Sequence, residues 1–152
     1  MKQEIINIAL KEVVSDVFEN MYFLFPEPVR QAEEIVSLPK SCFRASVKIK
    51  NRSEVLVLCA SEQLVTTMAK NFLGTEKFMD ETDLIDAFKE AANIISGNLV
   101  TRLAFNSNVV PDIPVAERSQ DCSELASPAG KNEVIFNIDD EYLKAGFVIQ
   151  GE

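Results

Sequence analysis

Four residues within residues 80–106 combine side chains and spacings that could act on a partner molecule. Asp86, Glu90, Asn93 and Gly97 recur at steps of three and four, which places them on one face of a helix. A carboxylate and a carboxamide three residues apart are neighbours on a helix surface. Gly97 has no side chain that could obstruct an approaching partner. This face is therefore our candidate site, and the alternative is an ordinary solvated helix face.

An apolar stripe opposite these residues supports a single long helix over residues 80–106. The stripe follows the helical period and consists of Leu84, Phe88, Ala91, Ile95 and Leu99. Asp80, Glu81 and Asp83 open the segment, where acidic side chains complement the positive end of the helix dipole. The polar face is thus expected to point away from the protein core.

Length, composition and charge favour a single cytoplasmic domain spanning residues 1–152. The chain has 152 residues, three cysteines without C-x-x-C spacing, and a net charge of −9. This acidity disfavours binding to nucleic acid or to anionic membranes. Acids interrupt residues 1–20, so we expect neither a signal peptide nor a membrane span there. The cysteines are expected to be reduced thiols, with Cys59 structural.

The missing residue types exclude several kinds of active site. The chain has no histidine, which rules out Ser-His-Asp and Cys-His nucleophilic systems and histidine-ligated metals. The glycine-rich loops that cradle nucleotide phosphates are also missing.

The first half of the chain predicts a helix, a hairpin and a second helix. Residues 3–24 predict one helix, whose apolar face comprises Ile5, Ile6, Ala9, Leu10, Val13, Val17 and Met21. The apolar run 21–25 is interpreted as its buried end, with a partner or ligand surface as the alternative, before Pro26 and Pro28 stop the helix. Residues 29–39 are expected to be a connection. Strands are expected over 41–50 and 54–60, followed by a helix from Ser61 to Leu73 that turns Leu64, Met68 and Phe72 inward and ends at Gly74.

The second half predicts strands after the central helix. Residues 109–116 are expected to be extended because of their two prolines, and residues 117–131 are expected to form a loop. Residues 133–138 and 142–149 predict a final hairpin. The whole order indicates an α+β fold, an antiparallel sheet with long helices packed on one face.

The central helix resembles a known signature. The pattern Asp86-x-x-x-Glu90-x-x-Asn93-x-x-x-Gly97-Asn98, followed by Pro114, resembles that of the CheC/CheX/FliY phosphatases of bacterial chemotaxis. The predicted order of elements is similar to that of CheX over nearly the whole chain. Glu4-x-x-Asn7 has the same short spacing, but lacks the preceding acid and has Lys11 in place of the glycine, so we interpret it as a chance match. A single full motif makes the chain CheX-like.

The resemblance implies a phosphatase for the aspartyl phosphate of CheY-type receiver domains. Asn93 would position the attacking water and Glu90 would contact a receiver lysine, while Asp86, Gly97 and Pro114 would support partner binding. The chain would need no cofactor of its own, because the receiver carries Mg²⁺. The resemblance also implies a homodimer.

Two other readings of the chain stay open. Ala92 stands in place of a more usual glycine, and the interval from Asn93 to Pro114 is slightly short. These departures motivate a non-catalytic binding module in two-component signalling. The other reading is a structural homodimer that pairs exposed sheet edges.

Overall fold

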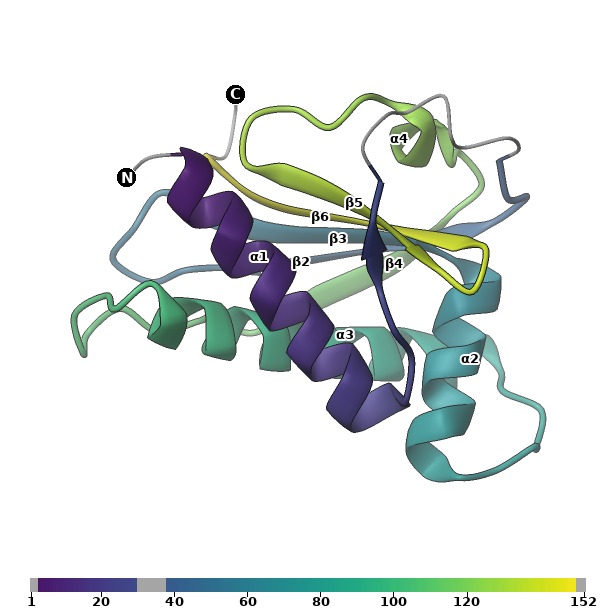
Figure 1. The fold of residues 1–152 in the computed structure, drawn as a ribbon. Coiled ribbons are helices and arrows are strands. Elements are labelled where there is room, and N and C mark those ends of the chain that lie inside the picture. Colours follow the sequence, from purple (N-terminus) through teal and green to yellow (C-terminus); the bar gives the residue numbers. More distant parts are fainter. Residues whose placement is uncertain (1–2, 30–37, 150–152) are drawn as a thin grey trace.

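The computed structural model describes residues 3–29 and 38–149 (Figure 1). The connection expected over residues 29–39 lies mostly outside these ranges. In chain order the elements are α1 (Gln3–Val17), the π-helical turn η1 (Phe18–Tyr22), β1 (Glu27–Pro28), β2 (Cys42–Lys48), β3 (Glu54–Ser61), α2 (Glu62–Leu73), α3 (Glu81–Arg102), β4 (Val115–Ser119), α4 (Ser123–Ala126), β5 (Glu133–Ile138) and β6 (Glu141–Ile149).

The described strands form one antiparallel sheet in the order β1-β5-β6-β3-β2-β4. Both predicted hairpins are present, since β2 pairs with β3 and β5 pairs with β6. Pairing of β3 with β6 joins the hairpins at the centre of the sheet. Sequence analysis missed β1, an edge strand in which Glu27 and Pro28 face β5. Proline is tolerated there because its nitrogen lies on the outer side of an edge strand, while the adjacent Val29 N–H donates to the Ile135 carbonyl of β5 at 2.8 Å.

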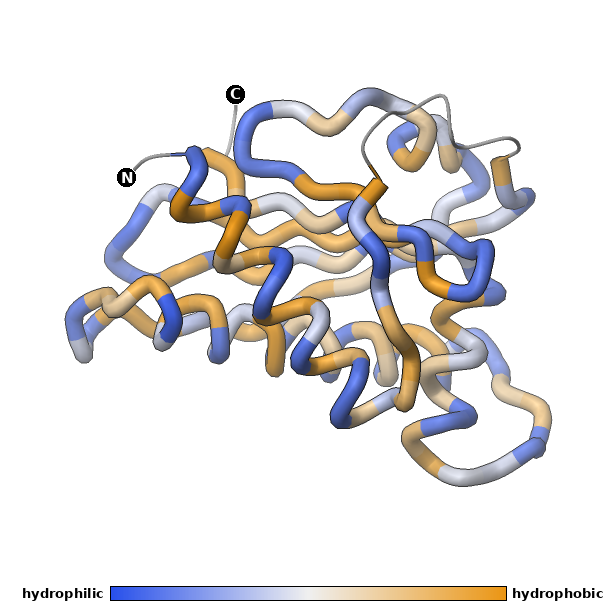
Figure 2. Tube along the Cα trace, in the orientation of Figure 1, coloured by the Kyte–Doolittle hydropathy of each residue, from blue (hydrophilic) through white to orange (hydrophobic). Residues whose placement is uncertain are grey.

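Helices α1, α2 and α3 cover one face of the sheet, as predicted, and the short α4 lies against the other face (Figure 1). Side chains of β2 alternate between the two faces of the sheet. Phe43, Ala45 and Val47 are buried under the helices, whereas Cys42 points to the α4 side. Apolar segments follow the central strands in Figure 2. Within the described ranges, no helix is both long and apolar enough to cross a membrane.

The three cysteines lie together on the α4 side of the sheet. Cys42, Cys59 and Cys122 are buried and free, and they pack with Leu125 of α4. Burial raises the pKa of the Cys59 thiol to about 12, so this thiol stays neutral at ordinary pH. The predicted structural role of Cys59 is consistent with this packing.

The predicted ends of α2 are confirmed. The Ser61 hydroxyl accepts a hydrogen bond from the Leu64 backbone N–H at 3.1 Å, which caps the start of the helix. Gly74 adopts a left-handed conformation with φ of 64° and ends the helix. The inward placement of Phe72 was wrong, because this side chain is 54% exposed.

The first helix differs from its prediction at both ends. Ile5, expected on the apolar face, is exposed, and the regular helix stops at Val17. A wider π-helical turn follows, which brings the rings of Phe18 and Tyr22 to 5.3 Å in an edge-on contact. The prediction of one continuous helix over residues 3–24 missed this turn, because a local change of pitch leaves no signature in the apolar period.

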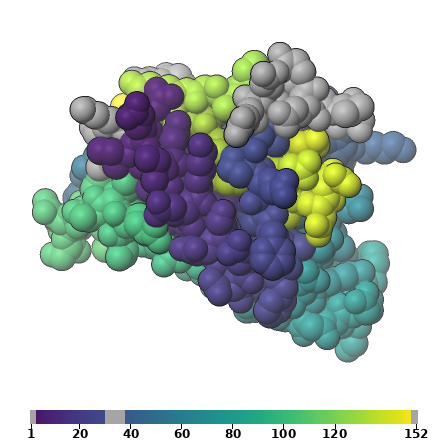
Figure 3. All heavy atoms as spheres, viewed as in Figure 1, coloured from purple at the N-terminus to yellow at the C-terminus, as the bar shows by residue number. Residues whose placement is uncertain are grey.

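The run 21–25 is only partly the buried helix end that was predicted. Tyr22 and Leu24 are buried, but Phe23 and Phe25 are 67% and 68% exposed. Phe23 ends the turn in a left-handed conformation, with φ of 57°, which redirects the chain towards β1. Figure 3 shows that the chain between α1 and β1 forms part of the molecular surface.

Two boundaries after the central helix also need correction. Helix α3 ends at Arg102 rather than near residue 106, because Ala104 takes a left-handed conformation with φ of 56°. Residues 117–131, expected to be a loop, contain the end of β4 and helix α4. Within 109–116, only Val115 and Ala116 belong to a strand.

Packing of α3 on the sheet predicts a large cost for a cavity at Phe88. This side chain is fully buried, so Phe88→Ala should lower the free energy of unfolding by about 3–5 kcal/mol. Urea denaturation followed by circular dichroism measures the change. Phe78, which is 88% exposed, provides the matched control, and Phe78→Ala should change stability by less than about 0.5 kcal/mol. Equal effects of the two substitutions would contradict the proposed core.

Candidate functional site

Helix α3 presents the predicted polar face to solvent. A reciprocal capping box fixes its first turn: the Asp83 N–H donates to the Asp80 carboxylate at 2.9 Å, and the Asp80 N–H donates to Asp83 at 3.1 Å. The predicted apolar stripe is buried throughout, as Leu84, Phe88, Ala91, Ile95 and Leu99. Consequently Asp86, Glu90 and Asn93 are exposed on the opposite side.

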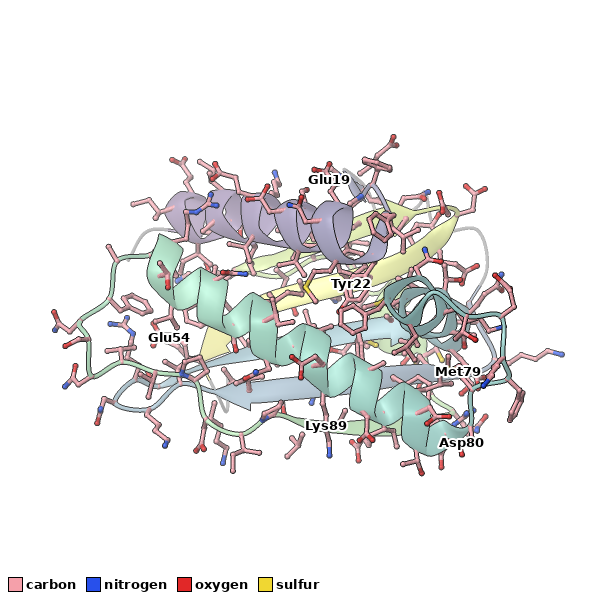
Figure 4. All side chains as sticks on the ribbon, turned by 90° about the horizontal axis from the view of Figure 1, so that it is seen from below. Glu19, Tyr22, Glu54, Met79, Asp80 and Lys89 are labelled. Atoms are coloured by element: carbon pink, nitrogen blue, oxygen red, sulfur yellow. The ribbon has the colours of Figure 1, made fainter. Side chains whose placement is uncertain are left out.

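A recess on the β4 side of α3 brings most of the predicted site together. We call it the Asn93 pocket. It has a volume of about 540 Å³, and its lining comprises Lys50, Asp86, Lys89, Glu90, Asn93, Pro111, Asp112, Ile113 and Pro114. Figure 4 shows Lys89 on this side of the helix. Asp86, Glu90, Asn93 and Pro114 therefore share one pocket, as their sequence pattern suggested, although they come from two distant segments.

Gly97 does not line this pocket. It lies one turn beyond Asn93, and a Cβ added at Gly97 would meet no atom within 4 Å. Packing therefore does not require a glycine at this position. The structure leaves room there for an approaching partner, but does not place Gly97 at the site.

Backbone hydrogen bonds hold the far wall of the pocket against the β2–β3 hairpin. The Asp112 N–H donates to the Lys48 carbonyl, and the Lys50 N–H donates to the Val110 carbonyl, each at 2.8 Å. Arg118 of β4 donates to Glu81, in the first turn of α3, at 2.6 Å. These contacts fix Pro114 relative to the helix that carries Asn93.

The two central side chains are available for binding. Among the described residues, neither the Asn93 carboxamide nor the Glu90 carboxylate has a hydrogen-bond partner in the protein. Side chains without internal partners on a well-anchored helix can bind an external group without first breaking contacts. The site can therefore offer a donor, an acceptor and a negative charge to a partner.

Sequence reasoning missed Lys50 and Lys89, which also line the Asn93 pocket. Lys89 directly precedes Glu90, and that adjacency could have drawn attention to it. Lys50 reaches the pocket only because β2 pairs with β4, a contact between distant segments. Both ammonium groups add positive charge to a pocket that otherwise carries Asp86, Glu90 and Asp112.

The second Glu-x-x-Asn pair occupies a related place in the fold. Apart from the short η1 and α4, the succession helix, strand, hairpin occurs twice, as α1-β1-β2-β3 and as α3-β4-β5-β6. Glu4, Asn7 and Pro28 each lie 86 residues before Glu90, Asn93 and Pro114. Chance spacing alone is therefore an incomplete account of Glu4-x-x-Asn7.

The surroundings of this second pair differ from those of the Asn93 pocket. The side-chain oxygen of Asn7 is buried and has no partner among the described residues, so it cannot hold a solvent water as an exposed Asn93 can. Lys11 takes the place that corresponds to Gly97, and Glu133 lines the adjoining recess. The two pairs share spacing and fold position but not chemistry.

Glu90 also acts on Tyr22, a residue that sequence analysis did not connect with the site. The Tyr22 ring lies between α2 and α3 in Figure 4. Burial raises the pKa of the Tyr22 hydroxyl to about 12, and the negative charge of Glu90 adds to this rise. Tyr22 is therefore a neutral hydrogen-bonding group over the whole physiological range.

This shift predicts how Tyr22 affects stability in alkali. The folded-state pKa lies above the ordinary value of 10, so the unfolded chain loses this proton first and stability falls as pH rises from 10 to 12. In an ultraviolet titration of tyrosinate, the signal that Tyr22→Phe removes should be centred near pH 12. Glu90→Gln should move that midpoint towards 10. An unchanged midpoint in the Glu90→Gln variant would contradict the electrostatic contact between Glu90 and Tyr22.

Comparisons with known proteins agree with the fold described above. The sequence pattern of the family "Chemotaxis phosphatase CheX" matches residues 43–139, a segment that carries the hairpin, α2, α3 and β4. No curated protein matches the chain in sequence. Among solved structures, chemotaxis protein CheX from Vibrio vulnificus is similar with a TM-score of 0.68 and 13% identity, covering 94% of this chain and 96% of that one.

Two further solved structures have the same fold. CheX from Desulfovibrio desulfuricans is similar with a TM-score of 0.64 and 15% identity, over 95% of this chain and 99% of that one. The CheX–CheY–BeF3–Mg²⁺ complex from Borrelia burgdorferi is similar with a TM-score of 0.63 and 16% identity, over 93% and 95%. On the family pattern, which spans more than half of its length, the chain belongs to the chemotaxis phosphatase CheX family.

Proposed function

We propose that this protein hydrolyses the aspartyl phosphate on a CheY-type receiver domain. The observation that carries the proposal is the joint exposure of Glu90 and Asn93, whose side chains have no hydrogen bond to a described residue, in a recess that Pro114 also lines. Membership of a family of chemotaxis phosphatases supports the same assignment. The similar structure from Borrelia burgdorferi, a CheX in complex with CheY, supports the choice of partner.

In this proposal Asn93 positions the attacking water. An acyl phosphate is already activated, so placing a water in line with the bond that breaks supplies much of the acceleration. The water oxygen bonds to phosphorus, the bond from phosphorus to the aspartate oxygen breaks, and the products are inorganic phosphate and a free carboxylate. A carboxamide suits this task because it accepts from water, donates to it, and carries no charge beside an anionic phosphoryl group.

In the same proposal, Glu90 orients the receiver rather than the attacking water. It lies one turn before Asn93, and its carboxylate can pair with the ammonium of a receiver lysine. Such a pair would set the angle at which the receiver approaches α3. The receiver would supply Mg²⁺, so the phosphatase needs none of its own. Asp86 and Pro114 line the same pocket and would shape the contact.

One of the departures that motivated a non-catalytic binding module does not touch the pocket. Ala92, in place of the more usual glycine, is fully buried in the hydrophobic core. Its methyl group therefore cannot alter the surface that the receiver would meet. Retention of the Asn93 carboxamide at the pocket also favours hydrolysis over binding alone, and turnover measurements separate the two.

Asn93→Ala should remove the catalytic effect. Loss of a positioned polar group typically lowers kcat by about 100-fold or more, and the exposed site should leave stability within about 0.5 kcal/mol of the parent. The measurement is the decay of a phosphorylated CheY-type receiver from the same organism, with and without the protein. If the Asn93→Ala variant accelerates receiver dephosphorylation as much as the parent protein does, Asn93 does not position the attacking water.

Glu90→Ala should mainly impair productive binding. We expect kcat/KM for the phosphorylated receiver to fall by about 10- to 100-fold, because the receiver loses its orienting ion pair. Glu4→Ala is the matched control, since Glu4 is also exposed and also stands three residues before an asparagine. It should change kcat/KM by less than about twofold. Similar losses from both substitutions would indicate a general charge effect instead.

A further inference from the structure

A second recess lies on the other side of Glu90, between η1, α2 and α3. We call it the Tyr22 groove. It has a volume of about 270 Å³, and its apolar lining includes Tyr22, Phe72, Leu73 and Ala87. The last turn of α2 supplies Phe72 and Leu73 to its edge, and α3 supplies Ala87. This groove is separate from the residues that we assign to the water.

The outer edge of the groove leaves large apolar side chains in water. Phe72 and Leu73 are 54% and 62% exposed, and the Phe72 ring lies 6.3 Å from that of Tyr22. Adjacent exposed apolar side chains around a recess are typical of surfaces that bind a partner. A bulky aliphatic or aromatic side chain would fit this volume and remove Phe72 and Leu73 from water.

The α3 wall of the groove carries only negative charge. Asp83, Asp86 and Glu90 stand along it, and none of the described residues lining the groove is cationic. Asp83 is partly engaged in the capping box, whereas Asp86 and Glu90 have no hydrogen bond to a described residue. Tyr22 stays neutral and can donate to a partner. The complementary ligand is therefore an apolar side chain next to a positive charge.

The groove is continuous with the Asn93 pocket, because Asp86 and Glu90 line both. A receiver whose phosphorylated site meets Asn93 therefore lies against the groove as well. We infer that the Tyr22 groove binds a bulky apolar side chain of that same receiver, flanked by a lysine or arginine. This inference rests on the proposed function for the identity of the partner.

The double substitution Phe72→Gln/Leu73→Gln tests the groove without touching the Asn93 pocket. Both positions are exposed, so the fold should persist. The probe is a CheY-type receiver from the same organism loaded with Mg²⁺ and beryllofluoride, and calorimetry gives the Kd. We expect the Kd to rise about tenfold or more, with kcat at saturating receiver unchanged. Phe78→Gln, an exposed aromatic position outside the groove, should alter the Kd by less than about twofold.

The outcomes separate this inference from the proposed function. If receiver binding depends on Phe72 and Leu73 but the parent protein hydrolyses no aspartyl phosphate, the groove inference stands and the proposed phosphatase function is wrong. If the double variant binds the receiver as tightly as the parent does, the groove inference is wrong, but the proposed role of Asn93 in hydrolysis is unaffected. A parent protein that binds no receiver would overturn the groove as well.

A photo-crosslinking experiment tests the predicted chemistry of the occupant. With p-benzoylphenylalanine introduced in place of Leu73, the crosslinked receiver peptide should contain a bulky apolar residue and a lysine or arginine within one helical turn. A crosslinked peptide without such a basic residue would overturn the charge argument. A crosslink between two copies of this chain would assign the groove to self-association instead and overturn the inference.

Discussion

The burial of one face of α3 against the sheet is the constraint from which the site follows. Phe88, Ile95 and Leu99 are fully buried, and the capping box at Asp80 fixes where the first turn begins. A helix pinned at its start and along its apolar face has no freedom to rotate about its axis. Glu90 and Asn93 must then point to solvent, because they lie opposite the buried stripe.

This constraint explains why half of the site could be predicted from the sequence. The period of Leu84, Phe88 and Ala91 determines both the burial of α3 and the direction of Glu90 and Asn93, so local spacing was sufficient. Turn chemistry was equally local at Ser61 and Gly74. The antiparallel pairing of β2 with β3 and of β5 with β6 was also predictable, because a short connection joins the strands of each pair.

The other half of the site depends on contacts between distant segments. Lys50 and Pro114 meet α3 because β4 pairs with β2 at the sheet edge, and no local period encodes that pairing. The π-helical turn and the left-handed Phe23 likewise arise from packing of Phe18 and Tyr22, not from propensity. These two features also place Tyr22 beside Glu90, which is why the groove was invisible from the sequence.

The two Glu-x-x-Asn pairs show what a short motif can and cannot specify. They share spacing, a later proline and a place in the repeated succession of elements, yet only α3 has an exposed carboxamide. The residue one turn later sets the surface, since Lys11 carries a long side chain where Gly97 has none. Function at such a motif therefore depends on the exposure of the asparagine, which neighbouring segments decide.

Charge gives the last constraint on how this protein could recognise a receiver. A net charge of −9 repels an anionic phosphoryl group at long range, although salt screens this beyond about 10 Å. Recognition must then come from short-range contacts. Lys50 and Lys89 offer positive charge within the Asn93 pocket, and the apolar edge of the Tyr22 groove offers attraction that charge does not oppose. Glu90, between the two recesses, would bind a cation from either side, so one carboxylate could link partner selection to the alignment of the water.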